Sequence, residues 1–429
     1  MKMKKVLAAA LSLACASTLF AATAVTASAA DKKEVVIWDY FETDAQKEMM
    51  QSLIDGFNAS QDEYEASHVY VPFADYEKQL TLGIASGELP DLVILDGCSM
   101  ASFIQLGLFG DISDVDINWD EYMEGPMEST MLDGKHYGIP FATNCTALFY
   151  NKDMFEENGW EIPETWNEFL ELLDTIQASG QQPLYFGFKD VWTCLAPWNA
   201  MACDLAPADV CQQVNRGETT FSVEYRELAE KILQLLPYAQ EDPYAYSYND
   251  ACTAFARGES AMYCIGSYAV PQIKSVNPDM NIDSFVFPAN DSADGQILNS
   301  GVDLQFCVME DCKDKEAAYE VLRFMLEDEN IQIYLDDQNA VPCKEGDFTL
   351  PSMLDGMKEY IEQGKMTDYQ DHYYPAEMAV DAMIQTYLMN QDTDAWLKKF
   401  DSDWKRYNRD LIRKVQEYQE ENGEGGSRS

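Results

Sequence analysis

Residues 34–96 alternate between short apolar runs and helical patterns, and this alternation constrains the fold more than any other feature of the sequence. The first helical pattern follows a capping-box sequence at residues 43–46, and the second runs from Asp75, a candidate N-cap, to Ile84. The apolar runs that flank them are residues 34–40, 68–73 and 91–96. Strand, helix, strand, helix, strand predicts a parallel sheet with helices on its faces, an α/β fold.

Similar signals continue along the rest of the chain. A second capping-box sequence at residues 165–168 opens an amphipathic helix that Gly180 is expected to end. Further strands are predicted at 146–151, 260–266 and 284–288, and further helices at 313–327 and 394–418. The last helix is expected to bury Leu397, Phe400, Trp404, Tyr407 and Leu411. Because the chain has 429 residues, more than one hydrophobic core usually supports, we expect two domains or lobes.

The charge of the chain excludes one class of partner. Asp and Glu number 75 against 29 Lys and Arg, which gives a formal net charge of -46 at pH 7. Such a surface repels phosphate backbones and anionic membranes, so nucleic acid is excluded as a partner. Because 47% of the residues are hydrophobic and 12% aromatic, the acidity does not imply disorder. We therefore expect an acidic globular protein.

The N-terminus predicts export. Residues 1–5 are basic, residues 6–30 are uncharged and rich in Ala and Leu, and Ala-Ser-Ala at 27–29 predicts signal-peptide cleavage after Ala29. A membrane anchor is disfavoured because Ala, Ser and Thr dilute the hydrophobicity of the run. A lipid anchor on Cys15 is a third interpretation, disfavoured because Ser12 stands where bacterial lipoprotein signals prefer Leu. We expect an extracytoplasmic protein, in the periplasm or on the cell surface.

The cysteines and histidines give no metal pattern. Ten cysteines remain after cleavage, without a CxxC pair, and we expect most of them to be free, buried thiols, with any disulfide pairing left open. The histidines His68, His136 and His372 stand apart from one another and from Cys or carboxylates at ligand spacing. We therefore expect neither a metal nor a cofactor.

Three internal segments, together with the N-terminal signal, carry a resemblance to a known family. Residues 76–91 have its helix, Ser-Gly break and Pro-Asp strand entry; residues 138–169 contain PETWNEF; residues 255–268 contain the pattern F-x-x-G-x-x-A-M followed by Gly-Ser-Tyr. On these motifs the chain resembles the extracellular solute-binding proteins of ABC importers, in the branch that carries sugars and oligosaccharides. The likeness covers residues 34–414.

The resemblance implies a periplasmic-binding-protein-like fold, in which two α/β lobes joined by crossing segments close over a ligand like a hinged clamp. Each lobe is then discontinuous in sequence. It also implies a membrane permease as partner, and we expect a monomer. The expected divisions are a signal peptide at 1–30, lobe one at 31–143 and 300–342, lobe two at 144–299 and 343–416, and a flexible tail at 417–429.

A site for a sugar needs flat aromatic surfaces for C–H faces and polar groups for hydroxyls, and open α/β sheets bind ligands at strand ends. By similarity to the family, the aromatic residues would stack on sugar rings, and the carboxylates and Asn144 would bond hydroxyls. The candidates are Trp38, Asp39, Tyr40, Asp75, Tyr76, Asp96, Asn144, Trp192, Trp198, Tyr268 and Asp303. Each has a structural alternative, because Trp and Tyr are ordinary core residues and Asp is an ordinary helix cap.

A neutral mono- or oligosaccharide is the expected ligand, because an anionic sugar would need nearby cations and only Lys189 and Arg257 are obvious candidates. A cationic solute such as a polyamine would also suit aromatic rings and carboxylates. A secreted glycoside hydrolase is the alternative of a different class, since it too uses paired carboxylates. The sequence contains no G-x-S-x-G elbow and no phosphate loop, so we predict a binding protein and no enzyme.

Overall fold

The computed structural model describes residues 32–41, 44–97 and 100–421. In this part of the chain, one mixed sheet of nine strands passes through the whole molecule, and β4 and β5 form a separate hairpin. The strands are β1 (Lys33–Asp39), β2 (Tyr64–Tyr70), β3 (Leu92–Leu95), β4 (Met131–Leu132), β5 (Lys135–His136), β6 (Ile139–Asn151), β7 (Met262–Gly266), β8 (Ile282–Phe285), β9 (Leu298–Val308), β10 (Val341–Pro342) and β11 (Met366–Thr367).

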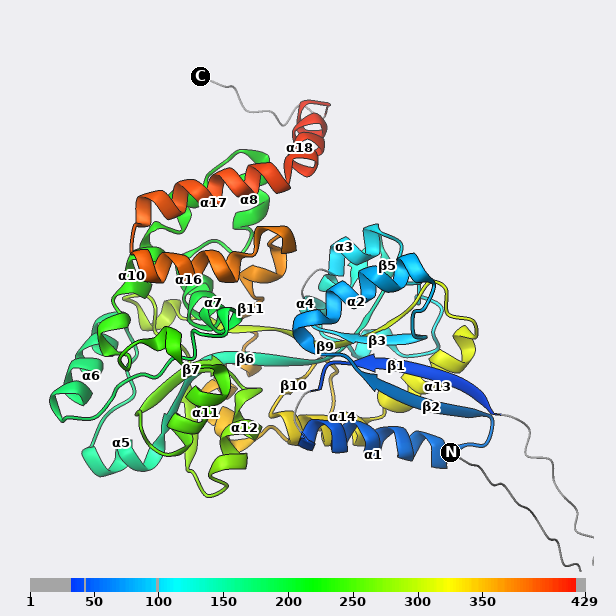
Figure 1. The fold of residues 1–429 in the computed structure, drawn as a ribbon, viewed down its shortest axis with the longest axis horizontal. Helices are drawn as coiled ribbons and strands as arrows, with labels where there is room; N and C mark the ends of the chain where they lie inside the picture. Colours follow the sequence, from blue (N-terminus) through cyan, green and yellow to red (C-terminus); the bar gives the residue numbers. More distant parts are fainter. Residues whose placement is uncertain (1–31, 42–43, 98–99, 422–429) are drawn as a thin grey trace, which may run out of the picture.

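Two bodies lie side by side and are connected by β6 and β9 (Figure 1). The helices of the first, called lobe one, are α1 (Asp44–Ser60), α2 (Phe73–Ser86), α3 (Met100–Gln105), α4 (Glu124–Ser129), α13 (Lys315–Met325) and α14 (Asp328–Gln338). Those of the second, lobe two, are α5 (Lys152–Asn158), α6 (Trp166–Ala178), α7 (Leu195–Leu205), α8 (Val210–Arg216), α9 (Phe221–Glu224), α10 (Arg226–Leu233), α11 (Tyr248–Ala256), α12 (Ala269–Val276), α15 (Lys358–Glu362), α16 (Val380–Asn390), α17 (Thr393–Tyr407) and α18 (Arg409–Glu421).

The sheet of lobe one has the predicted parallel core. β1 pairs in parallel with β2 along its full length and with β3 at Ile37 and Trp38, while β9 lies antiparallel on the far side of β3. Side chains alternate between the two faces, as the pleat requires. Ile37 and Ile94 pack with α1 and α13, whereas Val93 packs with α2 and α3. Both faces of this sheet are therefore covered by helices.

Helices α1 and α2 form largely where the sequence predicted them. The residues of α1 at helical spacing, Met49, Met50, Leu53, Ile54 and Phe57, are all buried, although Thr43 of its capping box lies outside the described residues. Helix α2 corrects one expectation: it begins at Phe73 with Pro72 as its N-cap, so Asp75 lies in the first turn and is not the cap. Gly87 ends α2 at φ +70°, a conformation that favours glycine.

The half of β6 that lies in lobe two has a hydrophobic core on each of its faces. Leu148 and Tyr150 face one core and Ala147 and Phe149 the other, and β7 and β8 pair antiparallel with this half of β6. In α6 the Thr165 hydroxyl accepts the N–H of Glu168, as expected for a cap. The Glu168 carboxylate accepts the N–H of Glu164 at 2.9 Å, one residue before the N-cap.

The C-terminal helix differs from the prediction. Residues 394–418 form two helices, α17 and α18, which meet at Asn408, and α18 projects from lobe two (Figure 1). Leu397, Phe400 and Trp404 are buried as expected, but the apolar stripe stops there: Tyr407 is 38% and Leu411 48% exposed. Because α18 continues to Glu421, the first residues of the expected flexible tail at 417–429 are helical.

The cysteines in the described part of the chain are free thiols. All except Cys312 are buried, and burial raises the pKa of Cys145 to about 12, which keeps this thiol protonated and unreactive. Cys98 lies outside the described residues. Among the residues described, none of the helices combines the length and the apolar character that a membrane crossing requires.

Candidate functional site

The two lobes meet where β6 crosses to β9. The strands pair antiparallel over residues 139–146 of β6, with Asn144 opposite Gly301, and the register shifts between Pro140 and Thr143. Such a shift bends and twists a strand locally. Asn144 and Asp303 therefore lie at the bend between the lobes, where the chain passes from one core to the other.

Asp303 is the centre of a hydrogen-bond network at this junction. Its Oδ1 accepts from Nδ2 of Asn144 at 2.7 Å, and its Oδ2 accepts from the hydroxyl of Tyr334, on α14, at 2.9 Å. The hydroxyl of Tyr40 donates to the backbone carbonyl of Asp303 at 2.8 Å. Burial raises the pKa of Asp303, against the effect of these hydrogen bonds and of His372. Both carboxylate oxygens are thus engaged by the protein itself.

A segment that follows β11 adds a second polar group. His372 lies in the short 3-10 helix η7 (Gln370–Tyr373), and its Nδ1 forms an ion pair with Oδ1 of Asp368 at 2.8 Å. Burial alone would lower the pKa of His372, but the carboxylates of Asp368, Asp371 and Asp96 outweigh it and raise the pKa to about 9. The imidazole is therefore charged at neutral pH.

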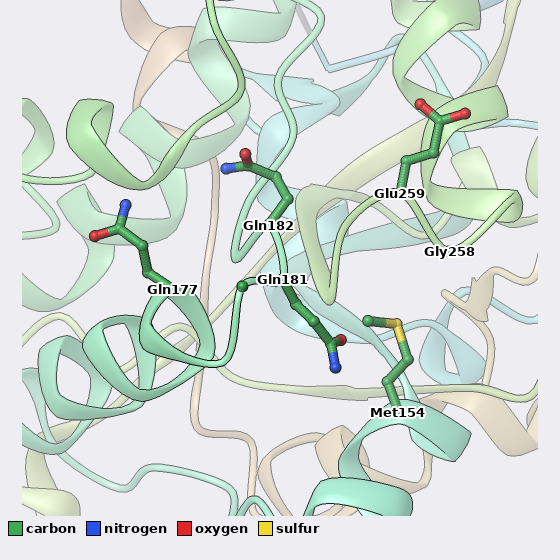
Figure 2. Close-up of a pocket in the computed structure, with 7 residues that line it drawn as sticks. Met154, Gln177, Gln181, Gln182, Gly258 and Glu259 are labelled. Carbon is green, nitrogen blue, oxygen red and sulfur yellow. The ribbon is translucent and has the colours of Figure 1, made fainter.

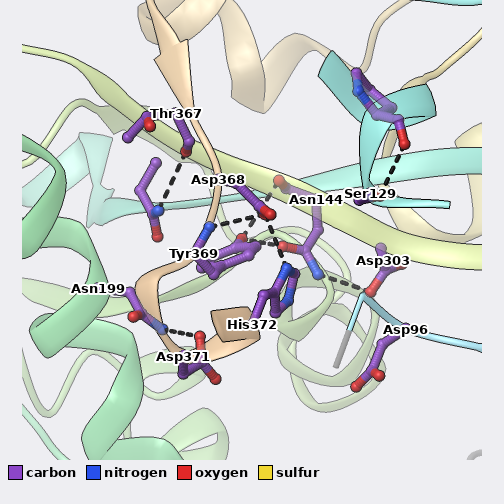
Figure 3. Close-up of polar contacts among 12 residues, drawn as sticks. Asp96, Ser129, Asn144, Asn199, Asp303, Thr367, Asp368, Tyr369, Asp371 and His372 are labelled. Carbon is purple, nitrogen blue, oxygen red and sulfur yellow. Dashed lines mark hydrogen bonds and ion pairs between the residues drawn. The ribbon is translucent and has the colours of Figure 1, made fainter. Parts of the chain in front are cut away.

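The same segment is tied to lobe two and to β6. Asp371 accepts from Nδ2 of Asn199, on α7, at 2.7 Å, and the Tyr369 hydroxyl donates to the side chain of Asn144. Figure 3 shows these contacts, with Asp303 on β9 and Asp96 directly after β3. Burial raises the pKa of Asp371, opposed by His372 and Asn199.

Three half-buried aromatic rings form a group in lobe two next to these polar residues. Trp192 lies in the 3-10 helix η2 (Val191–Cys194), Tyr248 begins α11, and Tyr268 follows β7. The ring of Trp192 is 5.1 Å from that of Tyr248 and 6.0 Å from that of Tyr268. Ser267, next to Tyr268, donates its N–H to the carbonyl of Cys145, the neighbour of Asn144, at 2.9 Å, which places Tyr268 beside the junction. The charges of Asp303 and Asp371 add to the effect of burial in raising the pKa of Tyr268. We call these three residues the aromatic group.

Six of the eleven predicted site residues lie at or beside the junction. They are Tyr40, Asp96, Asn144, Trp192, Tyr268 and Asp303. Trp38, half-buried, lies within β1 and packs against the α2 side of lobe one. Tyr76 packs edge-on against Tyr40 at 5.6 Å and is 3% exposed. Its hydroxyl donates to the backbone carbonyl of Trp38 at 2.8 Å.

Three of the predicted residues lie away from the junction. Asp39 is fully buried because it belongs to β1, and its carboxylate bonds Nδ1 of His68 at 2.6 Å. Trp198 is fully buried in α7, with its Nε1 donating to the hydroxyl of Tyr374 at 3.3 Å. Asp75 is exposed on the surface of α2, 4.0 Å from Lys78.

The sequence-based reasoning missed several residues of the junction. The sequence alone indicates an isolated histidine at 372, and it leaves undecided whether the aromatic pair that follows, Tyr373 and Tyr374, lines the rim of a cleft. The missed residues are Asn199, Tyr248, Tyr334, Asp368, Tyr369, Asp371 and His372. One signal was available: residues 366–374, MTDYQDHYY, combine carboxylates and aromatics more densely than their surroundings. Among the described residues, no cluster of His, Cys, Asp or Glu could hold a metal ion.

A separate surface hollow lies in lobe two (Figure 2). It has a volume of about 550 Å³ and lies between α5, the end of α6 and the turn before β7. Its lining is Met154, Gln177, Gly180, Gln181, Gln182, Gly258 and Glu259, which includes none of the predicted site residues.

Comparison with known proteins identifies the family. The model of the bacterial extracellular solute-binding proteins matches residues 52–353. The chain belongs to this family. Among curated proteins, it is 25% identical to the multiple sugar-binding protein of Streptococcus mutans over 381 residues, which cover 84% of this chain and 89% of that protein. It is 22% identical to the melibiose/raffinose/stachyose-binding protein MelE of Bacillus subtilis, covering 80% and 82%.

Solved structures of binding proteins share the fold. The structure of RafE in complex with raffinose aligns with a TM-score of 0.75 at 23% identity, covering 86% of this chain and 98% of that one. The two-lobed α/β architecture expected from the sequence is confirmed by this likeness. The family is extracellular, in agreement with the expected export.

Proposed function

We propose that this protein is the extracytoplasmic substrate-binding component of an ABC importer, which holds a neutral mono- or oligosaccharide between its lobes and delivers it to a membrane permease. The observation that carries the proposal is the aromatic group, Trp192, Tyr248 and Tyr268, beside the carboxylates of the junction. Rings of this kind offer flat apolar surfaces to the C–H faces of a sugar, and carboxylates accept from its hydroxyls. Relatives named for multiple sugars and raffinose support it.

We assign stacking to the aromatic group and hydroxyl recognition to Asp96, on the lobe-one side of the junction. Tyr40, whose hydroxyl donates to the backbone carbonyl of Asp303 at 2.8 Å, is assigned to positioning. Asn144 and Asp303 are assigned to positioning, because the other side chains of their network already occupy their polar atoms. Tyr76 packs against the ring of Tyr40 and donates to the backbone carbonyl of Trp38, so we assign Trp38 and Tyr76 to holding Tyr40 in place.

The crossing of β6 and β9 is the proposed hinge. The two strands pass from the lobe-one cores to the lobe-two cores, and the register shift at residues 140–143 supplies a local bend. A ligand favours closure only through contacts that the open arrangement lacks. A sugar stacked on lobe two and bonded to lobe one would make such contacts. The proposed lobe limits are 31–143 with 300–342 and 144–299 with 343–416.

Charge at the junction favours an uncharged ligand over an anionic one. The imidazole of His372 is the cation that the network supplies, and Asp368 already pairs with it at 2.8 Å. A phosphate or uronate would therefore compete with existing carboxylates for one positive charge. A polyamine remains the second candidate, because Asp96, Asp303, Asp368 and Asp371 give the junction an excess of negative charge.

Isothermal titration calorimetry on the mature protein tests the proposal. The panel contains raffinose, stachyose, maltotriose, xylotriose, a chitin trisaccharide and spermidine. We expect at least one sugar to bind and spermidine to bind more weakly. If spermidine binds and no sugar does, the ligand assignment is wrong. Chromatography of the bound sugar after long incubation separates a binding protein, which returns it intact, from a hydrolase, which yields shorter products.

The processing of the N-terminus has its own test. We propose cleavage after Ala29 and a monomeric mature protein, and residues 1–31 lie outside the described part of the chain. N-terminal sequencing of the secreted protein should begin at Ala30. A lipidated N-terminus at Cys15 would overturn the cleavage site, and light scattering of the mature protein gives its mass in solution.

A further inference from the structure

His372, carried by lobe two, rests directly on the backbone of lobe one. Gly97 follows β3 and donates its N–H to the carbonyl of Val302 at 3.0 Å. A Cβ atom added at Gly97 would lie 2.5 Å from both Cε1 and Nδ1 of His372, far closer than such atoms can approach. The absence of a side chain at Gly97 is therefore what lets the imidazole reach this position.

The imidazole is held firmly on the lobe-two side. Asp368 pairs with Nδ1 at 2.8 Å, and the ring of Tyr369 packs edge-on against the imidazole with centroids 5.1 Å apart. Asn199 fixes the following residue, Asp371, at 2.7 Å. The position of His372 is thus set by lobe two, while the surface it touches belongs to lobe one.

The charges of four carboxylates act on the imidazole. Asp368 and Asp371 come from its own segment, Asp96 from the end of β3, and Asp303 from β9. Without a positive charge at the centre, these carboxylates repel one another across the junction. A charged imidazole offsets that repulsion and draws Asp96, on lobe one, toward lobe two.

We propose that His372 is a positioning residue for lobe closure, a latch that seats on Gly97 and holds Asp96 of lobe one against the carboxylates of lobe two. The latch depends on the proposed function in one respect: its role would be to stabilise the closed arrangement of the lobes that holds a ligand. Gly97 and His372 both belong to this chain, so their contact can be tested without adding a ligand.

The latch should open at high pH. Because the pKa of His372 is raised to about 9 in the folded protein, above the usual value of about 6.5 for a free histidine, its contribution is fully present below about pH 6.5 and is lost as the pH rises through 9. Small-angle X-ray scattering of the wild-type protein should show a larger radius of gyration at pH 10 than at pH 7. His372→Gln, which cannot titrate, should show no such change.

A double-mutant cycle tests the steric contact between Gly97 and His372. Gly97→Ala places a methyl group against the imidazole, and Gly125→Ala, on α4, is the matched control because nothing lies within 4 Å of its added Cβ. At pH 7 we expect Gly97→Ala to enlarge the radius of gyration and Gly125→Ala to leave it unchanged. In a His372→Ala background, Gly97→Ala should have no further effect, since the ring it would meet is gone. Equal scattering of the two glycine variants, or an equal effect of Gly97→Ala in both backgrounds, would overturn the latch.

Nuclear magnetic resonance gives a second, direct readout. The chain has three histidines, so the Cε1–H resonances are few and His372→Gln assigns the one of interest. We expect that resonance to titrate near pH 9, and titration near 6.5 would overturn the proposal even if Gly97→Ala failed to fold. Calorimetry with the sugar panel described above distinguishes failure of the proposed function from failure of the latch. If the wild-type protein binds no sugar, the proposed function fails, while scattering and resonance still decide the latch.

Discussion

Two tryptophans six positions apart in the sequence should respond in opposite ways to truncation. Trp192 is half-buried in the aromatic group at the junction, whereas Trp198 is fully buried in the core of lobe two. Trp198 packs edge-on against Tyr225 at 5.4 Å and against Trp396 at 5.0 Å. Replacing each with Ala separates a ligand contact from a core contact within one short segment.

The magnitudes follow from burial. Trp198→Ala removes a whole core side chain and leaves a cavity, which costs about 3–5 kcal/mol of unfolding free energy. Trp192→Ala loses only part of a side chain's burial, about 1–2 kcal/mol. For ligand binding the order reverses. Loss of a stacking surface should weaken the sugar affinity of Trp192→Ala at least about tenfold, or about 1.4 kcal/mol. The sugar affinity of the folded Trp198→Ala molecules should be unchanged.

Urea unfolding followed by circular dichroism gives the stabilities, and calorimetry with whichever sugar binds the wild-type protein gives the affinities. Trp192→Phe is the control, since it keeps a flat ring and should retain most of the affinity. The reasoning is refuted if Trp192→Ala binds the sugar as the wild type does, or if Trp198→Ala loses no more stability than Trp192→Ala.

Substitutions at three carboxylates, with Tyr334→Phe as a comparison, are further tests. Burial raises the pKa of Asp204 to about 7 in the folded protein. Between about pH 4 and 7 this carboxyl is therefore ionised in the unfolded chain but not in the folded one, so the stability of the wild type falls as the pH rises. Asp204→Asn should gain up to about 4 kcal/mol over the wild type across this range, measured by urea unfolding at each pH. Asp303→Ala should cost about 2–5 kcal/mol because it strands buried partners, whereas Tyr334→Phe should cost only about 1 kcal/mol in the same assay. Asp39→Ala should destabilise the fold by about 2–4 kcal/mol, because Asp39 is fully buried and bonds the half-buried His68, and it should leave calorimetric sugar affinity unchanged.

Local patterns predicted the elements well because their causes are local. The spacing of Met49 to Phe57 gave α1, and the apolar run before Asp96 gave β3, since burial on one face depends on periodicity within the element. Patterns failed where the neighbouring element decided the outcome. Leu411 continues the apolar stripe of α17, but α18 turns away at Asn408 and leaves it 48% exposed.

The candidate site was predicted in part for the same reason. Tyr40, Asp96 and Tyr268 follow strands, and strand ends in such sheets gather at the site by geometry. His372 arrives there only because β11 pairs with β9 at Leu298 and Asn299, a contact between distant parts of the chain that no local pattern encodes. The same limit made Trp198 resemble a site residue when it belongs to the core.

The contacts of the junction carboxylates bear on the choice between a binding protein and a hydrolase. A hydrolytic acid needs a proton to give and an oxygen that faces the leaving group. Both oxygens of Asp303 instead already accept hydrogen bonds, from Asn144 and Tyr334, and these bonds oppose the effect of burial, which raises its pKa. Asp368 is held by His372 at 2.8 Å and Asp371 by Asn199 at 2.7 Å. Carboxylates held in this way by the protein itself suit the positioning role that we propose for them in a binding protein.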